Sequence, residues 1–199
     1  MPLSKRDFDS QLKYDAADAV FKIQGNYIVF DNSSDLDYQI IPQFTLGELL
    51  TKNPVASYTK LNKDLILKLQ AVCELWNAPG QTPLKINSSY RSPEYNKTVP
   101  GSSPNSRHCN GDAIDIGCVD PRVLAGLIDS LSASPNERGT YNWGCHMALG
   151  GTGYVSWDKT TDTSLTRKFR DAMENDSTRN YSIGGVLALI GIFIFTRFF

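Results

Sequence analysis

The sequence predicts an α+β fold, with helices packed on one antiparallel sheet and a C-terminal hydrophobic helix after them. Two segments show helical periodicity, and several short apolar segments are typical of strands. Near residue 181 the composition changes abruptly to apolar and uncharged. With 199 residues, the chain has room for one domain and extensions at its ends.

Residues 1–43 are predicted to form an N-terminal arm and a hairpin. Residues 1–20 are polar and fit a helix or an extended arm. Apolar residues cluster in 20–23 and 27–30, on either side of Gly25 and Asn26. Because glycine and asparagine adopt the backbone conformations of tight turns, this pattern indicates a β-hairpin.

Two helices are predicted in the central part of the chain. The first covers residues 62–76, with Asn62 as N-cap and a Pro-Gly pair at 79–80 as its stop. Its apolar positions follow a helical period: Leu65, Ile66, Leu69, Val72, Cys73 and Trp76. The second covers residues 121–131, with Asp120 as cap and Pro121 in the first turn.

The remaining elements are shorter. Residues 84–88 and 154–157 are predicted strands, and residues 163–174 are a predicted helix. Residues 161–180 therefore comprise a helix and a polar linker that precede the hydrophobic tail.

The strongest chemical signal lies in residues 106–116. His108 and Asp115 stand seven residues apart, and imidazole and carboxylate are ligands that zinc takes from proteins. Gly111 permits a sharp change of backbone direction between them. The apolar residues around Asp115 predict a buried strand that would hold its carboxylate rigidly. The segment therefore carries two of the three ligands of a zinc site.

Together with residues 86–96, this segment resembles the M15-type zinc peptidases. These D-Ala-D-Ala carboxypeptidases and peptidoglycan endopeptidases share a fold with the Hedgehog signalling domain. The family's Ser-Gly-Tyr-Arg-Ser run is matched by residues 88–92, with Ser89 in place of glycine, and its Ser-x-His-x-x-Gly-x-Ala-x-Asp run by residues 106–115. Residues 44–50 resemble the family's opening helix. The resemblance extends to about Asp158 and implies a Hedgehog/DD-peptidase-like domain at 44–160.

The resemblance implies roles for individual residues. His108 and Asp115 would bind zinc, and Ser106 would orient the histidine loop. Arg91 would face the substrate, since guanidinium pairs with carboxylate in a planar, bidentate way. Peptidoglycan stem peptides carry such carboxylates.

The implied third zinc ligand is a histidine on a late strand, and there the sequence departs from the pattern. Residues 150–158 match that segment, with Ser156 at the histidine position and Gly153 where some relatives carry a general base. A serine hydroxyl is a poor zinc ligand, and two protein ligands rarely hold the ion. We therefore expect a degenerate site, with Asp158 as a weak candidate for a base.

Other residues could supply the missing ligand. His146 lies ten residues before Ser156, in a segment that could fold back over the site as a loop. Cys109 and Cys145 could offer thiolates. In a zinc-free protein, Asp115 would pair with His108 or with Arg91.

Charge and cysteine content exclude some classes of protein. The 20 basic and 21 acidic residues nearly balance, so nucleic-acid binding, which needs a basic face, is not expected. The four cysteines form no C-x-x-C pair and fit free thiols in a reducing compartment; a disulfide among Cys109, Cys118 and Cys145 remains open. Residues 1–20 carry charges throughout and lack the apolar core of a signal peptide.

Residues 181–199 are predicted to be a single-pass membrane anchor. Residues 183–195 carry no charge, although a buried helix or an oligomer interface would also explain them. Four basic residues in 167–179 precede the span and only Arg197 follows it, which places the soluble domain on the cytoplasmic side. A peptidoglycan-directed domain could work there in a membrane-containing phage, between the virion's internal membrane and its capsid proteins.

Three functions follow from these observations. The first is a membrane-anchored M15-like protein with a degenerate zinc site, acting as a structural or peptidoglycan-associated component, such as a virion protein. The second is an active zinc-dependent D,D-carboxypeptidase or endopeptidase with an atypical third ligand. The third is a binding module for D-amino-acid peptides.

Overall fold

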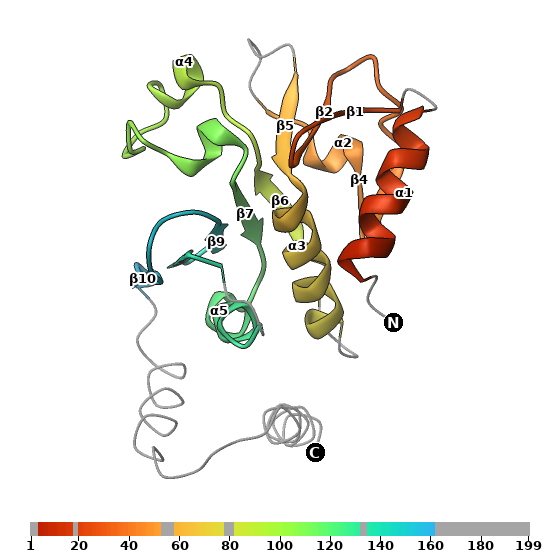
Figure 1. The fold of residues 1–199 in the computed structure, drawn as a ribbon. Helices are drawn as coiled ribbons and strands as arrows, with labels where there is room; N and C mark the ends of the chain where they lie inside the picture. Colours follow the sequence, from red (N-terminus) through yellow and green to blue (C-terminus); the bar gives the residue numbers. More distant parts are fainter. Residues whose placement is uncertain (1–3, 18–19, 53–57, 78–81, 132–134, 162–199) are drawn as a thin grey trace. The chain divides into compact units, whose positions relative to one another are not determined.

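The computed structural model describes residues 4–17, 20–52, 58–77, 82–131 and 135–161 (Figure 1). The chain divides into two units, Met1–Thr160 and Thr161–Phe199. The predicted helix at 163–174, the linker and the anchor at 181–199 lie outside the described residues. Within the described ranges, no helix is both long and apolar enough to span a bilayer.

The N-terminal part forms a helix and a small sheet. Helix α1 (Lys5–Ala17) confirms the predicted polar helix. Strands β1 (Lys22–Gln24) and β2 (Tyr27–Phe30) form the predicted hairpin, with Gly25 at a φ of 60° in its turn. Strand β5 (Thr59–Asn62) pairs with β2 and completes a three-stranded antiparallel sheet.

A second, short pair of strands precedes the helix that was predicted to open the M15-like domain. Strands β3 (Gln39–Ile41) and β4 (Phe44–Thr45) are antiparallel, and helix α2 (Leu46–Leu49) follows directly. A capping box joins the side chain of Thr45 to the backbone of Glu48, and the side chain of Glu48 back to Thr45. The cap satisfies backbone N–H groups that the helix start leaves free.

The two central helices agree with the prediction. Helix α3 (Lys63–Trp76) begins after Asn62, whose side chain accepts a hydrogen bond from the backbone of Asp64. Helix α5 (Pro121–Asp129) has proline in its first turn. Asp120 occupies the N-cap position of α5, but its side chain makes no capping hydrogen bond there.

A five-stranded sheet carries the candidate site. It consists of β6 (Lys85–Ser88), β7 (Ala113–Gly117), β8 (Glu137–Tyr141), β9 (Gly144–Ala148) and β10 (Val155–Asp158). The strand order is β10-β8-β9-β7-β6. The prediction of one antiparallel sheet needs correction, because β10 pairs with β8 in parallel and two smaller sheets are also present.

The hairpin of β8 and β9 was not predicted from the sequence. A loop around residues 143–146 that could fold back over the site was one possibility, whereas these residues form a tight turn and the start of a strand central to the sheet. The short helix α4 (Pro93–Asn96) and the 3₁₀ helix η1 (Arg107–Asn110) lie in the connection between β6 and β7.

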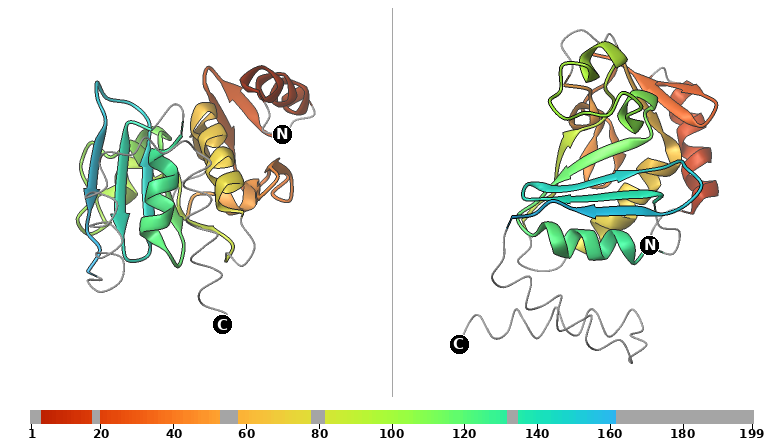
Figure 2. Two further views of the ribbon diagram at one scale, coloured as in Figure 1. Left: turned by 90° about the horizontal axis from the view of Figure 1, so that it is seen from below. Right: turned by 90° about the vertical axis from the view of Figure 1, so that its left-hand side faces the viewer.

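The two faces of this sheet have different surroundings. Helix α5 packs on one face, against β8 and β9, and α3 packs beside α5 (Figure 2). The apolar side chains of Ile114, Ile116 and Met147 are buried on this helix-covered face. Alternate residues of the same strands point to the other face, which we call the site face.

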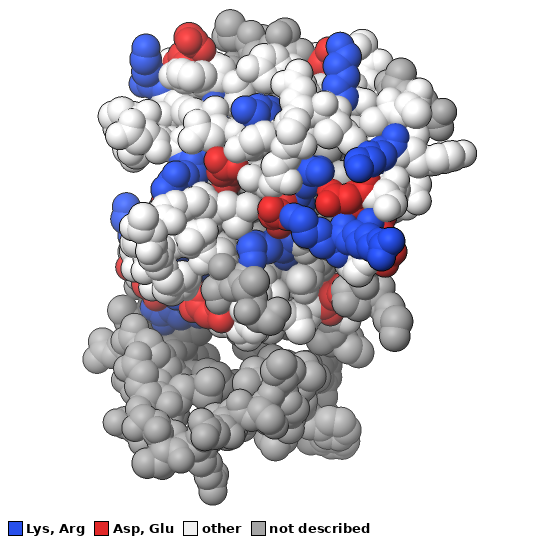
Figure 3. All heavy atoms as spheres, in the orientation of Figure 1, with Lys and Arg blue, Asp and Glu red and all other residues white. Residues whose placement is uncertain are grey.

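Acidic and basic side chains are mixed on the face of the molecule drawn in Figure 3. On the side drawn in Figure 3, Lys and Arg side chains lie among Asp and Glu side chains and do not gather into one basic patch. This distribution matches the near balance of 20 basic and 21 acidic residues.

Candidate metal centre

Strand register brings two of the candidate ligands together on the site face. Asp115 of β7 stands directly opposite His146 of β9, and His146 stands opposite Gly139 of β8. Residues directly opposite each other in neighbouring strands have side chains on the same face of the sheet. The carboxylate and the imidazole therefore meet across adjacent strands.

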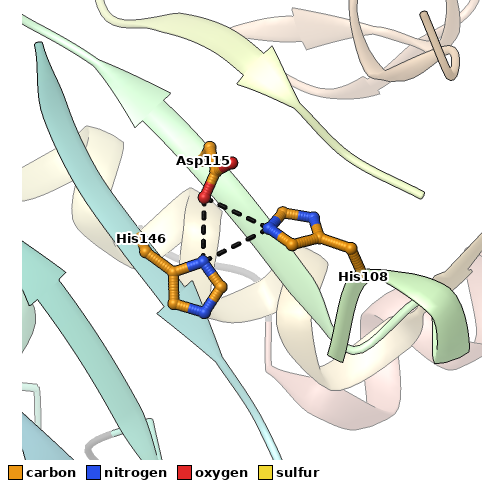
Figure 4. A group of neighbouring side chains, drawn as sticks. All are labelled: His108, Asp115 and His146. Carbon is orange, nitrogen blue, oxygen red and sulfur yellow. Dashed lines mark hydrogen bonds and ion pairs between the residues drawn. The ribbon is translucent and has the colours of Figure 1, made fainter. Parts of the chain in front are cut away.

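His108 joins this pair from the helix η1 (Figure 4). His108 Nε2 lies 3.2 Å from Asp115 Oδ1 and 3.3 Å from His146 Nδ1, while His146 Nδ1 lies 2.8 Å from Asp115 Oδ1. These are three ligand atoms from three elements, converging on one point. Tetrahedral zinc with bonds of about 2.0–2.1 Å separates its ligand atoms by roughly 3.4 Å, close to these distances.

The loop between His108 and Asp115 is held by backbone geometry. Gly111 ends η1 in the left-handed conformation, with φ at 80°, and a Cβ at this position would overlap the carbonyl oxygen of Lys60. The close approach lets the backbone N–H of Asn62 donate to the carbonyl of Gly111 at 2.9 Å. The sequence-based role of Gly111, a sharp change of direction, is confirmed.

A side-chain network fixes the same loop from the other side. The carboxylate of Asp112 accepts hydrogen bonds from the Tyr27 hydroxyl at 3.0 Å and from the Asn62 side chain at 2.9 Å. The N-terminal hairpin and the start of α3 thus support the segment that places His108 and Asp115.

His108 is prepared to act as a ligand. Its Nδ1 lies 2.6 Å from the carbonyl oxygen of Ser89, which can only accept a hydrogen bond. Nδ1 therefore carries the proton, and in the neutral ring Nε2 presents its lone pair to the other two ligands. Burial lowers the pKa of His108, which also favours the neutral imidazole.

Asp115 remains ionised in its buried position. Burial alone would raise the pKa of Asp115, but the neighbouring polar rings of His108 and His146 outweigh that effect and hold the pKa well below its usual range. Arg91 adds a positive charge, with Nη2 3.9 Å from Asp115 Oδ2. Both pairings expected for a metal-free protein, with His108 and with Arg91, are therefore present.

Arg91 lies beside the cluster, at the position from which it could reach a bound anion. Its backbone N–H donates to the carbonyl of His108 at 3.1 Å, which ties the two motifs together. Its Nε is buried and has no hydrogen-bond partner among the described residues. A buried guanidinium N–H without a partner is costly, so a ligand that accepts from it would be favoured.

The prediction that Ser156 stands at the third ligand position is wrong in this structure. Ser156 lies on β10 opposite Arg138, which in turn lies opposite Met147, a residue of the helix-covered face. Two strands, β8 and β9, also separate β10 from β7. His146, which the sequence analysis left as one of several alternatives, is the residue that meets His108 and Asp115.

The other sequence candidates are not brought to this cluster. Asp158 points to the helix-covered face, where Arg122 Nε lies 3.3 Å from its carboxylate, so it acts as a strand-end hydrogen-bonding residue. The Cys145 thiol donates to the carbonyl of Pro121 at 3.1 Å. Cys109 is outside the group of three ligands, and all four cysteines are free thiols.

Ser106 precedes η1 and stabilises the loop that carries His108 through its backbone. Its carbonyl accepts from the N–H of Cys109 at 3.0 Å, but its side chain makes no capping hydrogen bond. Ser106 lines a cavity of about 450 Å³ together with Arg107 and Glu137 among other residues, and the three candidate ligands are not part of its lining.

Glu137 is a site residue that the sequence analysis missed. Its Oε2 lies 4.0 Å from His146 Nε2, and its Oε1 accepts a hydrogen bond of 3.0 Å from Arg107 Nε. Strand β8, which begins at Glu137, has no alternating apolar pattern. The Asn142-Trp143 turn, followed by Gly144, was the signal that could have revealed the hairpin and its site-facing acid.

The chain matches a protein-family model. The model described as Peptidase M15 matches residues 42–146, which is more than half of the chain. The chain belongs to the peptidase M15 family. M15 enzymes depend on zinc, and the matched range contains His108, Asp115 and His146, its last residue. No curated protein matches this M15 chain significantly.

Proposed function

We propose that this protein is an active zinc-dependent peptidase that cleaves peptidoglycan peptides, as a D,D-carboxypeptidase or an endopeptidase. The observation that carries the proposal is the convergence of His108 Nε2, Asp115 Oδ1 and His146 Nδ1 within 3.3 Å of one another. Two imidazoles and one carboxylate match the three protein ligands of catalytic zinc sites.

The donor set fits the metal on chemical grounds. The carbonyl of Ser89 fixes the His108 tautomer, and the ionised Asp115 supplies a negative charge to a divalent cation. Zinc held by such residues activates water and polarises a carbonyl oxygen. The contribution of the chain is to hold three ligands rigidly on η1, β7 and β9.

Glu137 is our candidate for the residue that moves a proton during cleavage. It is the one carboxylate other than Asp115 within 4.0 Å of a candidate ligand among the described ion pairs, and it also lines the cavity that contains Ser106 and Arg107. The hydrogen bond from Arg107 fixes its orientation. A carboxylate in this position can take a proton from an attacking water and pass it to a leaving amine.

Arg91 is our candidate for substrate recognition. Its guanidinium lies beside the cluster and keeps one buried N–H without a partner in the described structure. A carboxylate of a stem peptide would satisfy this group and bring the neighbouring amide to the metal.

The hypothesis of a degenerate site depended on Ser156 as the third ligand position. The strand register supports the active site instead, because Ser156 lies in line with Arg138 and Met147 and not with Asp115.

Membrane attachment, by contrast, remains a proposal based on composition: residues 183–195 contain no charged residue. An internal virion membrane, with the domain facing the capsid, remains the location that reconciles a cytoplasmic orientation with a peptidoglycan substrate.

Digestion of purified peptidoglycan tests the enzymatic proposal. The zinc-loaded protein should release D-alanine or split cross-linked peptides, and mass spectrometry of the products identifies the bond. Stoichiometric zinc without cleavage of any stem peptide would contradict the peptidase and leave the peptide-binding module as the better account.

A further inference from the structure

A row of aromatic side chains leads away from the metal centre on the site face. The rings of Trp157 and His146 have their centroids 5.7 Å apart. Trp157 stands opposite Gly139, and its indole lies over that glycine, where a Cβ would be 2.5 Å from the ring. The absence of a side chain at Gly139 therefore lets Trp157 reach across β8 towards His146.

The row continues beyond Trp157. Its Nε1 donates to the Tyr141 hydroxyl at 2.9 Å, and Tyr141 stacks on Trp143 with centroids 4.9 Å apart and planes inclined by 9°. The ammonium of Lys159 lies 5.8 Å from the centre of the Tyr141 ring. Trp157, Tyr141 and Trp143 thus form a continuous aromatic row that begins at a candidate metal ligand.

The outer end of the row is open to solvent. Trp143 is 41% exposed, although burying its large ring would stabilise the protein. The hairpin turn holds it parallel to Tyr141 without covering it. A stacked aromatic surface with polar groups at its edge is suited to a flat ligand that has both apolar and hydroxyl-bearing parts.

We infer that the aromatic row binds sugar rings of the glycan strand to which the substrate peptide is attached. This inference rests on the proposed function, because the row starts at the centre where the peptide would be cleaved. The apolar C–H face of a pyranose ring would stack on Trp143 and its neighbours, while Lys159 would donate to sugar oxygens.

The chemistry favours a sugar over a nucleic-acid base, which would also stack on aromatic rings. Nucleic-acid affinity depends mainly on neutralising phosphates, and the chain has a formal net charge of −1. Lys159 is the one cation that contacts a ring of the row in the described structure. A glycan strand carries no phosphates, so its binding does not require a basic groove.

Binding of peptide-free glycan strands tests the inference. Glycan strands stripped of their peptides should bind the full-length protein saturably, with or without zinc, and alter its tryptophan fluorescence. Trp143→Ala should lower the affinity about tenfold, a loss of about 1.4 kcal/mol, because it removes the exposed stacking ring. Trp143→Phe, which keeps an aromatic ring, should retain most of the affinity.

Tyr14→Ala is the matched control, because Tyr14 is an exposed aromatic residue of α1, 71% exposed. It should bind glycan strands like the unmodified protein. Wild-type protein that fails to bind the strands, or a Trp143→Ala protein that binds them equally well, would overturn the inference. Zinc content and cleavage of free stem peptides should be unchanged in Trp143→Ala, because Trp143 is not one of the candidate ligands, so these measurements report separately on the proposed function.

Discussion

The carbonyl oxygen of Ser89 decides how His108 can act. Because this oxygen accepts a hydrogen bond from Nδ1 of His108, Nε2 of the neutral ring is directed at Asp115 and His146. His108 and Asp115 were predictable as ligands because both lie in one short motif. The contact between His108 and Ser89 was not predictable, because it depends on how two loops pack.

Burial of His108 predicts a pH dependence of stability in the metal-free protein. Its folded-state pKa lies below the unfolded value of about 6.5, so the unfolded chain binds the proton more readily. The free energy of unfolding should therefore fall as the pH drops below about 6.5. Denaturant titrations between pH 7.5 and 5 measure this, and His108→Asn should show a shallower fall. Equal slopes for both proteins would contradict the assignment.

The position of Glu137 predicts a catalytic defect without loss of metal. Glu137→Gln should lower kcat on stem peptides by about 10²–10⁴-fold, because proton transfer is lost, while zinc stays bound. Asp158→Asn is the matched control, since that carboxylate faces α5 and pairs with Arg122. A Glu137→Gln protein with full activity would remove Glu137 from the mechanism.

At the scale of elements, local patterns predicted some parts well and missed others. Helix α3 and the β1–β2 hairpin were predicted correctly, because periodicity and turn residues are local signals. Strands β8 and β9 were missed, since Glu137 and Arg138 begin β8 without an apolar alternation. The prediction for Ser156 was wrong for a related reason, because strand pairing is not a local signal. The residue that faces Asp115 is determined by the register between strands, which a comparison of motifs does not reveal.

Gly111 connects η1 to the rest of the fold and predicts a stability effect. Gly111→Ala should destabilise the protein by about 2 kcal/mol or more, because a Cβ would overlap the carbonyl of Lys60 in addition to the strain of a positive φ. Gly101→Ala is the matched control: its φ is 72°, but no atom lies within 4 Å of the added Cβ. Chemical denaturation should show the larger loss for Gly111→Ala; equal losses would exclude a role for the contact with Lys60.

At the scale of the whole molecule, the metal centre depends on contributions from distant parts of the chain. The N-terminal hairpin supports Asp112, η1 supplies His108, and the β8–β9 hairpin supplies His146 and Glu137. The antiparallel core of the sheet was foreseen, whereas its parallel edge at β10 was not.

The hydrophobic tail predicts attachment to membranes. The full chain should sediment with membranes and resist extraction by alkaline carbonate, whereas a chain ending at residue 180 should stay in the supernatant, because residues 181–199 supply the apolar span. Fractionation of producing cells measures this. A full chain found in the soluble fraction would contradict the anchor.

The zinc content of two variants tests the central claim most directly. Elemental analysis of the purified full-length protein should find one zinc per chain. His146→Ala should lose that zinc, and Ser156→Ala should keep it, since the first removes a ligand and the second alters a residue of the opposite face. Zinc that persists in His146→Ala, or disappears in Ser156→Ala, would contradict the proposed metal centre.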